Sequence, residues 1–484
     1  MSYPVESLEP KAVWKYFDKI RQIPHGSKNE AALGKAILEW AKERGHEGEM
    51  DAAGNVIVRI PATPGLENAP VLVLQGHLDM VCEKNTETEF DFENDPIVLR
   101  RDKEWIGAEG TTLGADNGIG VATGLAFMDV DVEHGPLELL MTVDEETGLN
   151  GAMSLQPDFV KGRMLFNLDS EEDGIFYVGC AGGRDATVTF PVTMTSPTHQ
   201  KAFELNLKGL RGGHSGLDII HNRGNAIRLV ARALKALKRE IDFELASLEG
   251  GDKHNAIARE ARAIILIESA DQEKLNAIVA AQLAGFRTEF ASHEPELALT
   301  LAPLATPEKI FEQDSAKKIL AAALAIPHGV QSMVRDLLGM VETSTNMARL
   351  RLEQGQIEVL CASRSSVAPA LQGVIDQIEA VGEALGAETK VGEGYPGWMP
   401  NMDSKMLAKA KEIWLATHGE DAQFQVIHAG LECGIIGEKY PGMDMISLGP
   451  TIINPHSPGE MVSIPSVDRF FKFVLAFVGA LART

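Results

Sequence analysis

A short apolar run that ends in a histidine and an aspartate is the feature that most constrains the fold. Residues 71–80 read VLVLQGHLDM, and this segment is rich in branched aliphatic side chains and free of charge before His77. Such a run is typical of a buried strand rather than of an amphipathic helix. His77 and Asp79 are therefore predicted to follow a strand, at the point where the chain leaves the core.

Further strand and helix signals alternate along the first part of the chain. Residues 30–44 place Leu33, Ile37 and Trp40 on one helical face, and residues 137–143 form another apolar run. Alternating strands and helices predict an α/β domain in which helices cover both faces of a mostly parallel sheet.

The pattern changes at about residue 186. From there to residue 394 the sequence spells β-α-β-β-α-β, the split βαβ pattern, and then repeats this order more weakly. We expect two tandem ferredoxin-like units, although the two passes share no usable sequence identity. The α/β pattern then returns. The predicted domains are a catalytic domain over 1–185 and 395–484, and an inserted α+β lid over 186–394.

Length and charge limit the classes of partner. A chain of 484 residues exceeds the size at which one core keeps growing, which favours more than one domain. The formal net charge of −24 disfavours nucleic acid and anionic membranes, because its long-range field repels phosphates and attracts metal cations. The sequence also lacks an apolar stretch long enough to cross a bilayer, and its start does not resemble a secretory signal.

The cysteines give no sign of a disulfide framework. Cys82, Cys180, Cys361 and Cys433 are far apart and form no CxxC pair, which also disfavours a thiolate zinc site. We expect reduced thiols that pack as small buried hydrophobic side chains, in a protein located in the cytoplasm.

Side chains that can bind metals recur at the ends of the predicted strands. Besides His77 and Asp79, the candidates are Asp116, Glu145, Glu146, Asp169 and His456. The carboxyl ends of parallel strands meet at one edge of a sheet, where open α/β proteins bind their ligands. We therefore expect these side chains to converge.

Carboxylates packed this closely repel one another unless positive charge lies among them. Two histidines with several carboxylates and no cysteine suit zinc or a similar divalent ion, and the set is large enough for two ions that share a bridging carboxylate. Two ions about 3.5–4 Å apart can activate a bridging water and polarise a carbonyl, which leaves one carboxylate to move protons. Taken alone, each motif also fits an ordinary acidic turn or loop, so the shared position carries the prediction.

Five motifs in this order, GHLDMV, LGADNGIG, VDEETG, NLDSEE and NPHSPGE, resemble the co-catalytic zinc exopeptidases of the aminoacylase and carboxypeptidase-G type. Within this family the sequence is most similar to the aminoacyl-histidine dipeptidase branch, and the resemblance covers the chain from end to end. It implies a hydrolase with two zinc ions that cleaves dipeptides with a free C-terminal carboxylate, including β-alanyl-histidine. It also implies that cobalt or manganese can replace zinc.

The resemblance assigns a role to each candidate. The implied metal ligands fall into two groups that Asp116 bridges: His77 with Asp169, and Glu146 with His456. Asp79 would orient the imidazole of His77. Glu145 would be the general base that takes a proton from the attacking water. Asp116 and Asn117 would be joined by a cis peptide bond.

In the inserted region, the resemblance implies contacts with the substrate. His214 in LRGGHSG would stabilise the oxyanion of the tetrahedral intermediate, although this segment alone fits a flexible turn. Asn255 and Arg364 would hold the substrate carboxylate, a task that suits the guanidinium fork, and a surface salt bridge remains an alternative for Arg364. His428 would contact the substrate with support from Glu432.

A doubled lid has a consequence for assembly. Relatives with a single lid borrow the oxyanion histidine from a partner subunit, whereas a doubled lid would let one chain supply both halves. A homodimer is therefore allowed but not required. We also expect hinge motion near residues 185 and 395, which would close the lid over the substrate.

Other functions could use the same residues. The same centre could deacylate N-acyl amino acids or trim longer peptides as a carboxypeptidase, and a substrate panel separates these activities from dipeptide hydrolysis. In a different class, the chain could be a catalytically silent metal-binding protein, but Glu145 beside the ligand set argues against this. Nucleic-acid binding finds no support in the sequence.

Overall fold

The computed structural model describes residues 3–5 and 7–483. The chain divides into two compact units. Unit 1 comprises Met1–Gly179, Trp398–Val426 and Leu431–Thr484, and unit 2 comprises Cys180–Gly397 and Ile427–Gly430. The short segment Ile427–Gly430 belongs to unit 2 because the backbone N–H of Ala181 donates to the carbonyl oxygens of Ile427 and Ala429.

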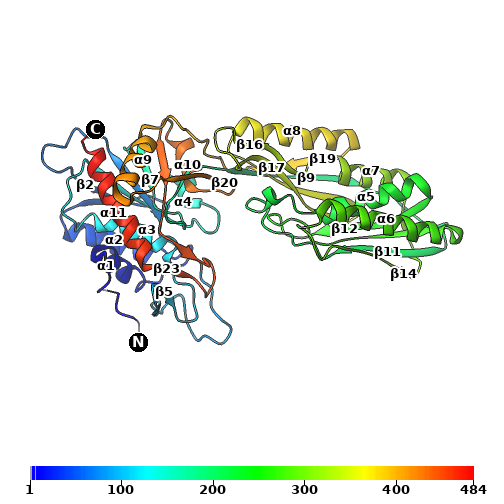
Figure 1. The fold of residues 1–484 in the computed structure, drawn as a ribbon, viewed down its shortest axis with the longest axis horizontal. Coiled ribbons are helices and arrows are strands. Elements are labelled where there is room, and N and C mark those ends of the chain that lie inside the picture. The colour runs from blue at the N-terminus through cyan, green and yellow to red at the C-terminus, as the bar shows by residue number, and fades with distance from the viewer. Residues whose placement is uncertain (1–2, 6, 484) are drawn as a thin grey trace. The chain divides into compact units, whose positions relative to one another are not determined.

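A mixed sheet forms the middle of unit 1 (Figure 1). In spatial order its strands are β1 (Glu47–Met50), β2 (Val56–Ile60), β6 (Leu137–Thr142), β3 (Leu72–His77), β7 (Met164–Asn167), β21 (Asp444–Ser447), β8 (Ile175–Cys180) and β20 (Gln423–Ile427). The central strands β6, β3, β7 and β21 run parallel, as predicted. The antiparallel pairs lie toward the edges, because β1 and β2 form a hairpin on one side and β8 runs against β21 on the other.

Helices cover both faces of this sheet, as the alternating pattern predicts. The helices of unit 1 are α1 (Lys11–Ile20), α2 (Ala31–Glu43), α3 (Ala115–Ala126), α4 (Asn150–Ser154), α9 (Lys405–His418), α10 (Glu432–Lys439) and α11 (Ile464–Leu481). On one face, Phe470, Phe473 and Phe477 of α11 contact the buried ring of Phe166 in β7. On the other face, α10 directs Glu432 toward β3.

A small antiparallel sheet holds the chain segment that carries His456. It consists of β22 (Ile452–Ile453), β23 (Met461–Ser463), β5 (Trp105–Ala108) and β4 (Leu99–Asp102). His456 lies in the connection between β22 and β23, whose pairing closes this loop. The pairing of β23 with β5 ties the loop to the segment that precedes α3.

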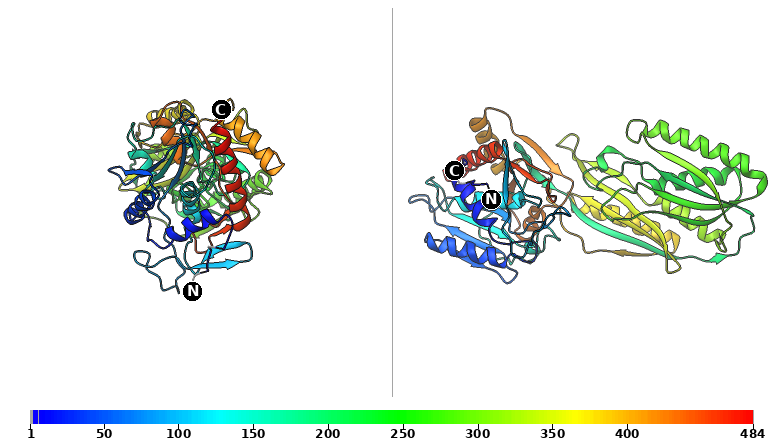
Figure 2. Two further views of the ribbon diagram at one scale, coloured as in Figure 1. Left: turned by 90° about the vertical axis from the view of Figure 1, so that its left-hand side faces the viewer. Right: turned by 90° about the horizontal axis from the view of Figure 1, so that it is seen from below.

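The main sheet of unit 2 is antiparallel and carries helices on one face (Figures 1 and 2). The strands, in order, are β14 (Ala298–Leu304), β11 (Lys201–Lys208), β13 (Ala261–Ile267), β12 (Phe243–Gly251), β17 (Val341–Glu353), β18 (Gln356–Ser365), β9 (Gly182–Pro191) and β19 (Glu388–Val391). The helices are α5 (Ala226–Glu240), α6 (Gln272–Phe290), α7 (Gln313–Ala325) and α8 (Ala368–Leu385). The remaining short elements are β10 (Met194–Thr195), β15 (Ile310–Phe311), β16 (Gly329–Met333), η1 (Ile219–His221) and η2 (Ser269–Asp271).

Each half of this sheet has the predicted β-α-β-β-α-β order. The first half runs β11, α5, β12, β13, α6, β14, and all of its strands are adjacent in space. The second half runs β9, α7, β17, β18, α8, β19, so its first strand lies upstream of the whole first half. The two ferredoxin-like units are therefore nested in the sequence, with the first inserted after β9 of the second.

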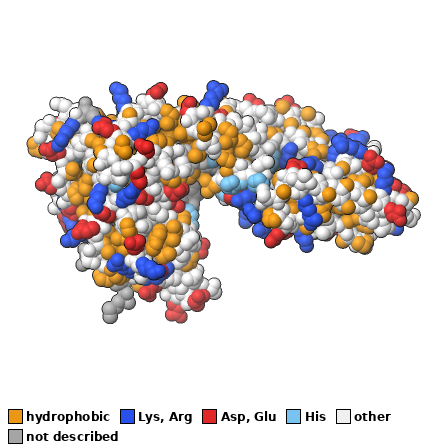
Figure 3. Space-filling model, viewed as in Figure 1, with side chains coloured by type: hydrophobic (Ala, Val, Ile, Leu, Met, Phe, Trp, Pro, Cys, Tyr) orange, Lys and Arg blue, Asp and Glu red, His pale blue; other side chains and the backbone are white. Residues whose placement is uncertain are grey.

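The cysteines all lie among the described residues, and no disulfide bond joins them. Cys180, Cys361 and Cys433 are buried, as predicted. Cys82 is exposed, contrary to the prediction, because it lies in the segment that follows β3 after the chain has left the core. On the face drawn in Figure 3, acidic and basic side chains are interspersed over both units.

Candidate metal centre

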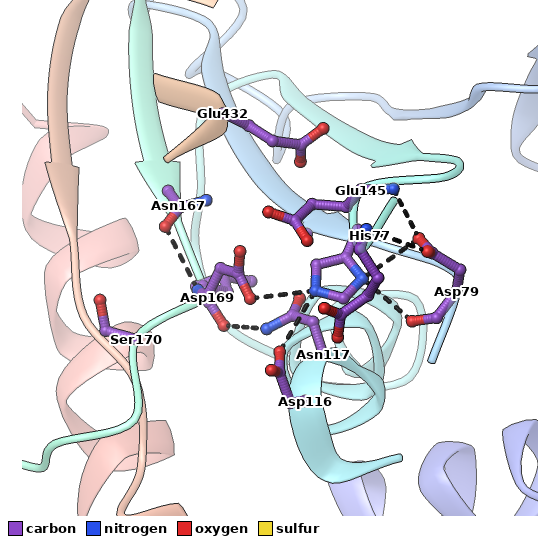
Figure 4. Close-up of polar contacts among 12 residues, drawn as sticks. His77, Asp79, Asp116, Asn117, Glu145, Asn167, Asp169, Ser170 and Glu432 are labelled. Atoms are coloured by element: carbon purple, nitrogen blue, oxygen red, sulfur yellow. Dashed lines mark hydrogen bonds and ion pairs between the residues drawn. The ribbon is translucent and has the colours of Figure 1, made fainter. Parts of the chain in front are cut away.

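The predicted metal ligands converge in unit 1, at the carboxyl ends of its parallel strands (Figure 4). His77 is the last residue of β3, Glu146 follows β6 and Asp169 follows β7. Asp116 lies in the first turn of α3, and His456 reaches the cluster from the β22–β23 connection. We call these five residues the Asp116 cluster.

Asp116 lies between the two histidines. Its Oδ1 atom is 3.2 Å from Nε2 of His77, and its Oδ2 atom is 3.1 Å from Nε2 of His456. Oδ1 of Asp169 is 3.4 Å from the same nitrogen of His77, and Oε1 of Glu146 is 3.0 Å from that of His456. Each oxygen of Asp116 thus belongs to a different group, which is the arrangement of a carboxylate shared by two cations.

The donor atoms of each group are close enough for one ion. One atom from each of His77, Asp116 and Asp169 lies within 4.8 Å of the others, and the same holds for Asp116, Glu146 and His456. Each group offers an imidazole nitrogen and carboxylate oxygens, which are donors that zinc and related divalent ions accept. The residues therefore fit two divalent ions, one in each group.

The carboxylates create an environment that favours positive charge on both histidines. Burial alone would lower the pKa of His77, but Asp169 and Asp116 outweigh it and hold this pKa well above its ordinary value. Hydrogen bonds to Asp116 and Glu146 raise the pKa of His456 to about 11. Divalent ions bound in the cluster would supply this positive charge in place of the imidazole protons.

Asp79 connects the ring of His77 to the turn after β6. Nδ1 of His77 lies 3.0 Å from the carbonyl oxygen of Asp79 and 3.4 Å from its Oδ1. The carboxylate of Asp79 also accepts hydrogen bonds from the backbone N–H groups of Glu145 and Glu146, at 2.9 and 3.2 Å. Burial would raise the pKa of Asp79, but these contacts and His77 lower it to about 2. One carboxylate thus orients both the imidazole and the glutamates.

Glu145 lies beside the Asp116 cluster. One of its oxygens is within 4.8 Å of donor atoms of His77 and Glu146. Figure 4 shows its carboxylate directed into the space between His77 and Glu432. Burial, together with the charges of Asp169 and Glu432, raises the pKa of Glu145 well above the usual glutamate value despite the opposing effect of His77. A carboxylate with raised proton affinity beside a metal centre is suited to general base catalysis.

The peptide bond between Asp116 and Asn117 is cis, as the resemblance implies. The side-chain amide of Asn117 donates a hydrogen bond to the carbonyl oxygen of Leu168 at 2.8 Å. A Cβ atom on Gly76 would collide with the side chain of Asn117, so the glycine of GHLDMV allows α3 to approach β3 closely.

Sequence reasoning missed Glu460, the last residue of NPHSPGE. Its carboxylate is buried and accepts backbone N–H hydrogen bonds at 2.7 to 3.2 Å from Leu113, Gly114, Ala115 and Asp116. Glu460 therefore holds the turn that carries the bridging aspartate. The motif contained a signal for this role, because its last residue is acidic and is not among the predicted metal ligands.

A row of fully buried polar side chains behind the metal centre was also missed. Oε2 of Glu432 accepts hydrogen bonds at 2.6 Å from Nε2 of Gln75 and from Oγ1 of Thr142, and its Oε1 is buried without a partner. Oε1 of Gln75 accepts from Nδ2 of Asn167 at 2.6 Å, and Asn167 in turn accepts from Ser447. These partners differ from the prediction that Glu432 supports His428, because α10 directs Glu432 toward β3 and β6.

The predicted substrate contacts lie together in unit 2. His214 pairs with Ala256 in an isolated bridge, and the backbone N–H of Ser215 donates to the carbonyl oxygen of Asn255 at 2.8 Å. A Cβ atom on Gly216 would lie 3.1 Å from Cε1 of His214 and 3.2 Å from Cδ of Arg364. We call His214, Asn255, Arg364 and His428 the Arg364 cluster.

Arg364 carries a positive charge, and one of its N–H groups has no hydrogen-bond acceptor. Its Nη1 donates to the hydroxyl of Tyr395 at 2.8 Å, but its Nε is buried with no acceptor. Nε2 of His428 pairs with Oγ of Ser344 at 2.7 Å, and burial together with Arg364 lowers the pKa of His428 to about 3. The ring of His428 is therefore neutral at pH 7. A partly buried guanidinium whose Nε has no acceptor suits a carboxylate ligand, whereas a surface salt bridge does not describe this environment.

Comparisons with known proteins agree with this geometry. Residues 205–294 match the family model of the peptidase dimerisation domain. The cytosol non-specific dipeptidase of Escherichia coli is 41% identical over 472 residues, which cover 97% of each chain. The solved structure of an aminoacylhistidine dipeptidase from Vibrio alginolyticus has a TM-score of 0.95 and 41% identity, over 99% of this chain and 98% of that one. The aminopeptidase PepT of Bacillus cereus, at 16% identity and a TM-score of 0.57 over 98% and 99% of the chains, shares the fold.

The relationship to the Escherichia coli protein extends over nearly the whole length of both chains, so it includes both units and every motif of the Asp116 cluster. Every helix among the described residues is too short or too polar to span a bilayer. The family to which these relatives belong uses a divalent metal cofactor, for which the Asp116 cluster provides suitable donors. This chain belongs to the M20 metallopeptidases, within the branch that contains the cytosol non-specific and aminoacylhistidine dipeptidases.

Proposed function

We propose that this protein hydrolyses dipeptides with a free C-terminal carboxylate, using two zinc ions held by the Asp116 cluster. The observation that carries this proposal is the pair of contacts from Asp116, one oxygen near His77 and the other near His456. Two bound ions would polarise the scissile carbonyl and lower the pKa of the attacking water. The name of the Vibrio alginolyticus relative supports aminoacyl-histidine dipeptides, such as β-alanyl-histidine, as substrates.

Glu145 is the proposed general base. It takes a proton from the attacking water and then donates it to the nitrogen of the departing amino acid. Its raised pKa, caused by burial and neighbouring carboxylates, supports its role in holding this proton. Asp79 supports this role because it holds the backbone of Glu145 and the ring of His77 at the same time.

The Arg364 cluster is proposed to bind the anionic groups of the substrate. Arg364 and Asn255 hold the C-terminal carboxylate, and the unmade hydrogen bond of Arg364 supports this assignment. His214 stabilises the oxyanion that forms from the scissile carbonyl, and His428 contacts the substrate as a neutral imidazole. Because the substrate must present a free C-terminal carboxylate to Arg364 and Asn255, we expect peptides longer than dipeptides to be poorer substrates.

A substrate panel on metal-depleted and zinc-restored protein tests this function. Dipeptide hydrolysis should disappear on chelation and return when about two equivalents of zinc are added. Dipeptides should be cleaved faster than tripeptides and N-acyl amino acids. Faster turnover of N-acyl amino acids would instead establish a deacylase, and binding of zinc without any hydrolysis would establish a silent metal-binding protein.

The matched dimerisation domain raises the question of assembly. Within this domain, Gly250 and Gly251 at the end of β12 pair with β17 of the same chain, so the second ferredoxin-like unit of this chain adjoins the first at this edge. We therefore propose that one chain carries the complete catalytic set, even when a homodimer forms through other surfaces. Specific activity should stay constant on dilution through the dissociation of any dimer, which analytical ultracentrifugation measures. We also propose a cytoplasmic location, in line with the name of the Escherichia coli relative and the absence of disulfide bonds among the described cysteines.

A further inference from the structure

A cavity of about 810 Å³ lies beside the Asp116 cluster, entirely within unit 1. Its lining includes the proposed metal ligand Glu146 and the adjacent Thr147. The remaining wall comes from residues near the start of α2, from the segment that follows β3 and from the loop that contains Phe92. A group bound at the metal centre is therefore in direct reach of this cavity.

The chemistry of the wall is apolar and acidic. Met80, Val81 and Phe92 contribute apolar groups. Glu93 and Glu146 are its charged lining residues, and the described part of the chain contributes no lysine or arginine to the lining. A second carboxylate placed in this cavity would meet the negative charge of Glu93, which no lysine or arginine of the described lining compensates, whereas the ions proposed for the Asp116 cluster would neutralise Glu146. An apolar side chain would gain from leaving water, and a cationic one would be attracted.

The wall is connected to the metal centre by hydrogen bonds. The backbone N–H of Met80 donates to the carbonyl oxygen of His25 at 3.1 Å, and the hydroxyl of Ser27 donates to Asp79 at 2.8 Å. Asp79 also accepts from the backbone of Glu146. These hydrogen bonds fix the position of the cavity wall relative to the proposed metal ligand Glu146, as a substrate subsite requires.

The order of groups along a dipeptide determines which of its side chains can occupy the cavity. In the proposed function, the C-terminal carboxylate is held by the Arg364 cluster of unit 2, and the scissile carbonyl belongs to the amino-terminal residue. We propose that this cavity in unit 1 is the subsite for the side chain of the amino-terminal residue, and that it favours apolar and cationic side chains over acidic ones. This inference rests on the dipeptide hydrolysis proposed above.

A panel of dipeptides with a common C-terminal glycine tests the preference. The values of kcat/KM for Leu-Gly and Lys-Gly should each exceed that for Glu-Gly by about tenfold, because only the acidic side chain meets like charge. The reversed series, Gly-Leu, Gly-Lys and Gly-Glu, should show a smaller spread. A larger spread in the reversed series would overturn the assignment of the cavity to the amino-terminal residue.

Charge reversal at Glu93 tests the cavity itself. In Glu93→Lys, the ratio of kcat/KM for Glu-Gly to that for Lys-Gly should rise by about fivefold or more. Glu89→Lys is the matched control, because Glu89 is an exposed residue of the same loop that does not line the cavity and the change in net charge is identical. The control should leave the ratio at the wild-type value. Equal shifts in both variants, or a shift in neither, would overturn the proposal.

A third variant probes the apolar wall. Phe92→Ala should raise KM for Leu-Gly more than KM for Gly-Gly, because only the former substrate fills the cavity. Equal changes for the two substrates would contradict the subsite. Wild-type hydrolysis of Gly-Gly serves as the reference: if it is absent, the proposed function itself fails, whereas its presence with unaltered ratios in the variants overturns the subsite alone.

Discussion

The Asp116 cluster of unit 1 and the Arg364 cluster of unit 2 have electrostatic environments of opposite sign. The first gathers carboxylates around two imidazoles, which raises the pKa of His456 to about 11 and marks a site for cations. The second places a partly buried guanidinium, whose Nε has no acceptor, beside a histidine with a lowered pKa, which favours an anion. The proposed sites for metal and for the substrate carboxylate therefore lie in different units, so variants should be able to remove one without the other.

The largest effect should come from the bridge between the two metal groups. Asp116→Asn keeps the size of the side chain but removes the negative charge that both groups share. We expect metal content to fall and dipeptide hydrolysis to drop to background, which metal analysis and a turnover assay measure together. An Asp116→Asn protein that retained two ions and wild-type activity would refute the bridging role.

Glu145→Gln should separate chemistry from metal binding inside unit 1. The expected loss in kcat is about 10²–10⁴-fold, the usual contribution of a general base, with two ions still bound. Glu146→Gln is the matched control, because it changes the neighbouring glutamate and should reduce metal content instead. Retained turnover in Glu145→Gln would show that another group moves the proton.

Arg364→Met should affect the substrate and leave the metal centre intact. Loss of the charge-assisted hydrogen bonds, about 1.5–3 kcal/mol, predicts a rise in KM of about 10- to 150-fold with normal metal content. Dipeptides with an amidated C-terminus should lose their disadvantage in this variant, because they lack the carboxylate that Arg364 binds. If metal content fell as well, the division of labour between the two units would be wrong.

A smaller effect is expected from Glu460→Gln, which leaves every proposed ligand in place. The amide offers only one acceptor oxygen to the backbone N–H groups that precede and include Asp116. Groups that orient metal ligands typically contribute about 10- to 100-fold in metal affinity, so the dissociation constant should rise within this range. Titration of metal-depleted protein measures it, and an unchanged constant would show that the turn holds its shape without Glu460.

These residues also show how far sequence reasoning reaches. The proposed metal ligands could be anticipated because each follows or opens an element whose apolar pattern is local, and parallel strand ends must meet. The hydrogen bonds of Glu460 and Glu432 could not, because their partners are 290 to 357 residues away and are backbone N–H groups or neutral side chains. For the same reason the sequence does not identify β9 as the first strand of the second ferredoxin-like unit, because its neighbours β18 and β19 follow a complete intervening unit.

The nested order of unit 2 constrains how the nascent chain can assemble. When β9 leaves the ribosome, the strands that flank it have not been synthesised, since Pro191 pairs with Gln356 and Glu388 pairs with Thr189. Apart from Gly250 and Gly251 of β12, which pair with the later strand β17, the strands β11 to β14 pair with one another, so this half can condense earlier. Until the distant strands arrive, β9 presents open backbone groups on both sides, the kind of edge that invites mispairing and engages chaperones.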